Sequence, residues 1–217
     1  MSRFSFLYHP NSETYEKSFL NDFALGGSSA SFTVTGANLG AASTSREIFV
    51  VVTWRSTSIR NLTSVTIAGV SATLGTKASY STTIGMRCAW ATVPAGTSGN
   101  IALGFSGLVT GVGVSTYRVV ARPVGGPHTD FKSAGTGGNT FLSLSSVSVT
   151  SNGFILSAFQ SVVVPETTSV SGLSLVEDGG DADSHFASTA IRSAATGTVT
   201  WSWATTTSAL AATWSFN

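Results

Sequence analysis

Three groups of side chains in this 217-residue sequence have the types and spacing to do chemistry. The densest is the acidic segment 177–185, which holds four carboxylates among glycines and ends on His185. Alternating carboxylates suit calcium in a loop, but the segment lacks the full EF-hand spacing and its bidentate glutamate. Two interpretations stay open, a calcium loop and a solvated turn between strands. The second predicts no metal ligands, and a chelator would then leave thermal stability unchanged.

The second group is the five tryptophans, whose rings could stack on sugars. Trp201 and Trp203 are two residues apart, so a strand would place both rings on one face. They are candidates for glycan contact or for core packing. Core packing is the favoured interpretation, because their counterparts in an internal repeat, Leu103 and Phe105, are typical core residues.

The third group consists of Tyr15, Phe19 and Phe23, which recur every four residues in a comparatively charged segment. This is a helical spacing, and Gly26 and Gly27 supply a stop signal. The pattern predicts a short helix or an extended arm over residues 11–25, within an N-terminal attachment arm at 1–27. The three rings either staple this segment onto its own domain or dock on a partner subunit.

No catalytic motif accompanies these groups. The three histidines are far apart, no GxSxG elbow occurs, and no glycine-rich loop opens a helix. The arginines and lysines are scattered, without a stripe that would follow a phosphate backbone. Cys88 is the only cysteine and lies in a strand-like segment, which favours a packed thiol. We therefore expect a non-enzymatic protein without catalytic residues, cofactor or nucleic-acid partner.

Composition restricts the protein class further. Charged residues make up 10% of the chain and the net charge is +1, whereas 35 serines, 30 threonines and 23 glycines dominate. An average domain carries about 25% charged residues. The longest apolar run, Ile48–Val52, is far shorter than the ~20 residues of a membrane-spanning helix. These features predict a protein without a membrane partner, made in the cytoplasm without an export signal.

From about residue 29 onward the hydrophobic pattern has a period of two, and Gly, Ser, Asn and Pro separate short β-rich runs. This pattern predicts an all-β fold, a jelly-roll-like β-sandwich over residues 28–217. Segment 48–54 resembles segment 153–159, and segment 99–105 resembles segment 197–203. The repeat predicts similar halves at about 28–121 and 139–217, either merged into one sandwich or arranged as two tandem ones.

Four segments together resemble virion structural proteins of bacteriophages and prophages, often from phages of alphaproteobacteria. They are Ile48–Trp54, Thr63–Leu74, Ala91–Gly99 and Leu210–Phe216. The resemblance spans roughly residues 30–217 and implies a virion protein, made in the host bacterial cytoplasm, that acts as capsid decoration, head fibre or tail appendage. It also implies a homo-oligomer, with a trimer expected, that contacts capsid or tail proteins. The alternative is a carbohydrate-binding module or adhesin that recognises host glycans through Trp201 and Trp203.

Overall fold

The computed structural model describes residues 16–121, 130–149, 153–162, 168–171, 177–180, 186–189 and 195–216. Within these ranges every regular element is a β-strand, so the all-β prediction is confirmed. The strands are β1 (Glu16–Asn38), β2 (Glu47–Arg55), β3 (Leu62–Ile67), β4 (Val70–Ser71), β5 (Thr73–Tyr80), β6 (Ile84–Thr92), β7 (Ser98–Val120), β8 (Asp130–Val149), β9 (Phe154–Ser161), β10 (Thr168–Ser171), β11 (Glu177–Gly180), β12 (Phe186–Thr189) and β13 (Ala195–Phe216). No helix in the described ranges is long and apolar enough to cross a membrane.

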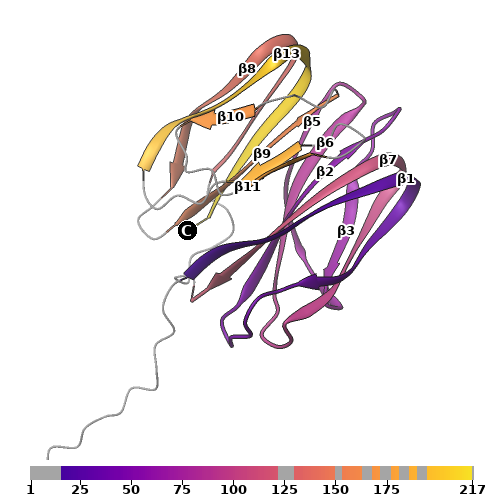
Figure 1. Ribbon diagram of the computed structural model, residues 1–217, viewed down its shortest axis with the longest axis vertical. Helices are drawn as coiled ribbons and strands as arrows, with labels where there is room; N and C mark the ends of the chain where they lie inside the picture. Colours follow the sequence, from indigo (N-terminus) through magenta and orange to yellow (C-terminus); the bar gives the residue numbers. More distant parts are fainter. Residues whose placement is uncertain are drawn as a thin grey trace, which may run out of the picture.

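The first seven strands form one sheet that curls into a sandwich. The sheet has the order β4-β3-β7-β2-β6-β5, with β1 paired to β7. Strand β7 is the shared element: β1 pairs with it along nearly its whole length, β3 pairs with its first part, and β2 pairs with its second part. Figure 1 shows β1 and β7 running side by side around this lobe. The expected sandwich architecture is confirmed.

The second half of the chain repeats this pairing pattern. Strand β13 is again the shared element, paired with β8 over most of its length, with β10 in its first part and with β9 in its second part. The short pair β11 and β12 corresponds in order to β5 and β6. Thus β1, β2, β3 and β7 have counterparts in β8, β9, β10 and β13, and Figure 1 shows the two lobes stacked together.

Strands β2 and β9 are covered on both faces, which explains why their sequences are apolar without alternation. Seven consecutive residues of β2 are buried, as are all eight of β9. On β2, Ile48 and Val50 face the first core, inside the first half, whereas Phe49 and Val51 face a central core between the halves. On β9, Phe154 and Leu156 face the same central core. A strand covered on both faces needs apolar residues at every position.

A third core lies inside the second half, and it contains both Trp201 and Trp203. The molecule therefore stacks four sheet layers around three cores. The two inner layers, one from each half, pack face to face through the central core. This stacking joins two sandwich-like halves through the central core.

Of the two forms predicted for residues 11–25, a short helix or an extended arm, the helix is wrong for the residues that the structure describes. Residues 16–25 belong to β1, and the expected boundary at residue 27 falls inside that strand. A spacing of four fits a strand as well as a helix, because four is a multiple of the strand period of two. A register shift between Phe19 and Asn21 turns Phe19 toward the central core and Phe23 toward the first core.

Candidate functional site

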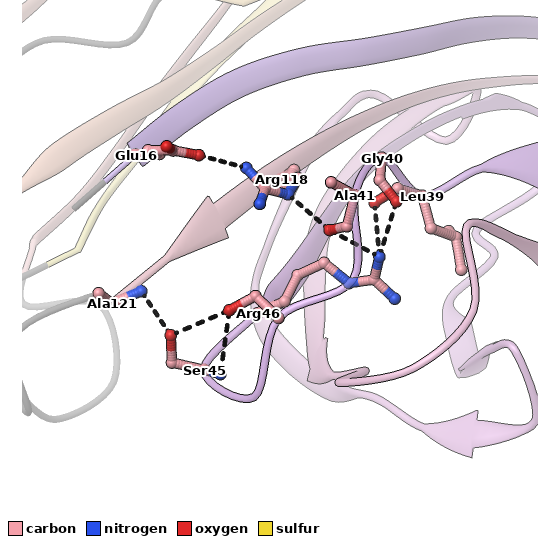
Figure 2. A network of polar contacts seen from close by, with 9 residues as sticks. Glu16, Leu39, Gly40, Ala41, Ser45, Arg46, Arg118 and Ala121 are labelled. Atoms are coloured by element: carbon pink, nitrogen blue, oxygen red, sulfur yellow. Dashed lines mark hydrogen bonds and ion pairs between the residues drawn. The ribbon is translucent and has the colours of Figure 1, made fainter. Parts of the chain in front are cut away.

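The most concentrated polar network of the described residues surrounds two arginines at one end of the first half (Figure 2). Arg46 directly precedes β2 and is fully buried, at 0% exposure. Arg118 lies near the end of β7 and is partly buried. The loop at residues 39–46 supplies carbonyls to both guanidinium groups, and the turn at 93–97 supplies carbonyls to that of Arg46.

The Arg46 guanidinium donates five hydrogen bonds, all to backbone carbonyls. The acceptors are Val93 (2.7 Å), Ala95 (2.8 Å), Gly40 (2.9 Å), Ala41 (3.1 Å) and Leu39 (3.2 Å). Nε makes one of these contacts, Nη2 makes one and Nη1 makes three, so the two hydrogens of Nη1 are shared among three carbonyls. Burial lowers the pKa of Arg46 below its ordinary value, and the charge of Arg118 lowers it further. Arginine nevertheless stays protonated in proteins, so Arg46 works as a charged clamp between two loops.

Arg118 extends the clamp to the start of β1. Its Nη1 lies 2.7 Å from the Glu16 carboxylate, and its Nε donates to the Ala41 carbonyl at 3.0 Å. A Cβ at Gly40 would meet the Arg118 side chain at 2.7 Å, and the φ of Gly40 is +69°. Only glycine fits this position comfortably, because it tolerates positive φ and has no Cβ. The close approach of loop and strand therefore depends on that residue.

The same network also binds Ala121, the last described residue of the first half. The Ser45 hydroxyl accepts a hydrogen bond of 2.9 Å from the backbone N–H of Ala121. Residue 121 is the last described residue before 130, and Glu16 is the first one of the described chain. Figure 2 shows Glu16 next to Arg118 and Ala121 next to Ser45, both on the left of the view. The network thus sets where two segments, 1–15 and 122–129, join the folded body.

This arrangement has no chemistry of its own. All three guanidinium nitrogens of Arg46 donate to backbone carbonyls, and Arg118 is bound to a carboxylate and a carbonyl. Within the described ranges, no group of three or more His, Cys, Asp or Glu side chains could hold a metal ion. The network is a structural anchor, and sequence reasoning missed it by treating Arg46 as one of several scattered cations. Its position directly before the apolar run at 48–52 was the available signal.

The candidate glycan contacts, Trp201 and Trp203, are in the third core, at 1% and 5% exposure. Trp201 donates to the Ser157 hydroxyl at 2.9 Å, and both rings contact Phe159. Rings buried in this way cannot stack on a sugar from solvent, so the structure agrees with the favoured interpretation, core packing, and not with an exposed glycan platform. The other three tryptophans are also buried, at 8% exposure or less.

The candidate docking residues of the N-terminal segment are separated. Phe19 contacts the ring of Tyr117, with 5.4 Å between centroids, and Phe23 is partly buried against the first core. Tyr15 lies outside the described residues. The structure therefore places Phe19 and Phe23 against their own sandwich, as staples rather than as one exposed apolar stripe.

The acidic segment 177–185 falls partly outside the described residues. Its first four residues form β11, whose backbone pairs with β12, and residues 181–185 are not described. Cys88 is fully buried in the central core, and burial raises the pKa of its thiol well above the ordinary value. A protonated, enclosed thiol is a poor nucleophile, in agreement with the packed thiol expected from the sequence.

Comparison with known proteins adds no relative: no protein-family model matches the chain, and no curated protein matches it significantly.

Proposed function

We propose that this protein is a non-enzymatic structural component on the surface of a bacteriophage particle, as capsid decoration, head fibre or tail appendage. The single observation that carries the proposal is that the tryptophans and Arg46, the side chains best suited to bind a ligand, are buried inside the protein. All five tryptophans are buried, and Arg46 binds backbone carbonyls only. Such a use of side chains suits a rigid scaffold.

The segments that resemble virion proteins support the proposal. They coincide with β2, with β3 to the start of β5, with the turn between β6 and β7, and with the end of β13. These are elements of the three cores and their connections. The charge-poor surface also suits a particle exposed to changing ionic strength, because salt screens charges and leaves hydroxyl groups largely unaffected.

The attachment segment of this proposal is residues 1–15. The anchor around Arg118 and Glu16 fixes where this segment leaves the sandwich. Residues 16–27 belong to β1 and pair with β7, so the proposed attachment segment is shorter than the arm at 1–27 expected from the sequence. The proposed partners are capsid or tail proteins of the virion, with the chain assembled as a homo-oligomer.

The alternative function, a carbohydrate-binding module, depended on Trp201 and Trp203. Their burial leaves that alternative without its aromatic platform. Isothermal titration with host surface polysaccharide gives its direct test, and we expect no heat of binding.

Mass spectrometry of purified particles tests the proposal. We expect the chain in intact virions, and its stoichiometry relative to the major capsid protein separates decoration (many copies) from a tail role (few copies). Its absence from purified particles would overturn the proposal.

Two truncations then test the attachment segment. A chain beginning at Glu16 keeps β1 and should fold with an unchanged circular dichroism spectrum, yet fail to bind particles that lack the protein. A chain beginning at Ser28 removes the part of β1 that pairs with residues 111–120 of β7 and should lose stability as well. Undiminished particle binding by the first truncation would contradict attachment through residues 1–15.

A further inference from the structure

The two halves contact each other through equivalent faces. Strand β5 lies against β8, and the counterparts of these strands, β11 and β1, also lie together. Strand β6 lies against β13, and correspondingly β12 lies against β7. Strand β2 lies against its own counterpart, β9. The contact between β5 and β13 has no reciprocal of similar extent between β11 and β7 within the described residues, but the other contacts occur in reciprocal pairs. Reciprocal pairs are the mark of an isologous interface, the kind that joins two identical subunits across a two-fold axis.

Phe49 and Phe154 mark that axis. They occupy equivalent positions in the sequence repeat, on β2 and β9 respectively. Their rings are fully buried and meet edge to face, with 5.0 Å between centroids. A residue that contacts its own equivalent lies on or next to a two-fold axis. Phe216 contacts both rings, at 4.8 Å and 5.0 Å, and completes the centre of the interface.

The outer part of the interface is held by specific contacts as well. The indole N–H of Trp214 on β13 donates to the Thr76 carbonyl of β5 at 2.8 Å. A Cβ added to Gly135 on β8 would overlap the ring of Tyr80 on β5, so that ring packs directly on the glycine backbone. The interface thus combines a buried aromatic centre with polar and shape-specific contacts near its margin, as a recognition surface between subunits does.

We propose that the face of the first half that carries Phe49, Val51 and Trp90 is a self-recognition surface, and that a second copy of the chain can fill it. The second half of the same chain (130–216) occupies it in the structure. The second half of another copy presents the same surface. Two chains that exchange halves form a closed dimer in which every interface of the monomer is retained.

The connection between the halves sets the balance between monomer and exchanged dimer. Eight residues, 122–129, join Ala121 to Asp130. A short connection gives an effective concentration on the order of 1 mM for pairing within one chain. Dilute chains therefore pair internally, and exchange competes when the chain concentration approaches that value. The surface of a particle that carries many copies is one such place.

Co-refolding of the wild-type chain at two concentrations gives the first test. Chains are unfolded in urea, refolded at ~10 µM or ~1 mM, and analysed by size-exclusion chromatography with light scattering. Because the effective concentration is about 1 mM, we expect the dimer fraction to rise from under about a tenth to about half. Monomer alone at both concentrations would overturn the proposal.

Two full-length variants then identify the surface. One carries Tyr80→Cys on β5 and the other Gly137→Cys on β8, each with Cys88→Ala, because a Cβ at the exposed Gly137 would lie 2.9 Å from the Tyr80 hydroxyl and a reagent can reach this margin of the interface. A short bifunctional thiol reagent is added after refolding. We expect a cross-linked dimer when the two variants are refolded together at high concentration. We expect none when either is refolded alone. A chain with both cysteines should cross-link internally, which verifies folding and reach.

The remaining outcomes contradict the proposal. Cross-linking of Tyr80→Cys chains with one another would show that first halves pair together, rather than exchanging for second halves. An internal cross-link in the doubly substituted chain, with no dimer in the mixture, would show that the halves never exchange. Neither measurement involves particles, so the result is independent of the proposed virion role.

Discussion

Replacing Arg46 with methionine removes a buried clamp while keeping an unbranched apolar side chain. Two of its five carbonyl acceptors, Leu39 and Val93, receive their bonds in buried surroundings, whereas water can reach the other three. A buried acceptor without a donor costs about 1–3 kcal/mol, so these two together cost about 2–6 kcal/mol. Removing the desolvation penalty of a buried charge offsets part of this. We expect the free energy of unfolding to fall by about 2–4 kcal/mol.

Urea unfolding followed by circular dichroism measures this loss, with an unchanged slope required for the comparison. For a chain of this length, such a loss lowers the melting temperature by about 4–16 °C. Arg60→Met is the matched control. The Arg60 guanidinium also donates to two backbone carbonyls, of Ile59 and Leu108, but in exposed surroundings. Because water replaces an exposed donor, the control should change stability by less than about 0.5 kcal/mol.

Equal stability of Arg46→Met and Arg60→Met would refute the idea that Arg46 clamps the two loops. It would mean that the loops at 39–46 and 93–97 keep their positions without the guanidinium, with water satisfying their carbonyls. Arg46→Lys refines the test, because an ammonium has three donors and no planar fork. We expect it to recover less than half of the lost stability.

Three further predictions concern other parts of the fold. Gly85→Ala should destabilise by about 1–3 kcal/mol in urea unfolding, because its Cβ would overlap the buried ring of Trp54, while Gly138→Ala, with open space around it, should be neutral or slightly stabilising. Burial opposes ionisation of Asp130, but the Ser148 N–H and the Lys132 ammonium lower its pKa below the ordinary value. Because the folded-state pKa is lowered, the ionised carboxylate stabilises the fold above the unfolded value of ~3.9, and this stabilisation is lost as the pH falls toward the folded-state pKa. The wild-type melting temperature should therefore fall more steeply than that of Asp130→Asn between about pH 5 and 3. The Cys88 thiol should not react with a thiol reagent at neutral pH in the native protein and should react fully in urea, and reaction of the folded protein would contradict its burial.

Local pattern predicted most of the strand structure. Alternating segments such as 31–35 and 199–203 became parts of β1 and β13. The run at 48–52 lacks alternation because β2 is covered on both faces, and that requirement is visible in the sequence itself. The weak repeat was visible too: Leu103 and Trp201 are equivalent in it. They pair with Val65 on β3 and with Val170 on β10, and these two strands are counterparts.

The N-terminal segment shows where local pattern is insufficient. The spacing of Phe19 and Phe23 is compatible with a helix and with a strand, and the choice depends on pairing with β7, about 100 residues later in the chain. The register shift after Phe19, which sends the two rings to different cores, has no signal in the local sequence. Contacts of such long sequence separation are set by the whole sheet.

The sequence by itself determined the class of the protein: alternating apolar residues, abundant β-branched and hydroxyl side chains and scarce charge favour strands and exclude helical bundles. Period-two spacing also placed Trp201 and Trp203 on one face of a strand. Only the tertiary structure decided that this face is interior, because β8, β10 and β13 curl over the third core. It likewise decided that Arg46 is buried, since its five acceptors come from two loops that the chain brings together from positions up to 49 residues away. Periodicity is a property of neighbours, whereas the inside of a molecule is defined by segments distant in sequence.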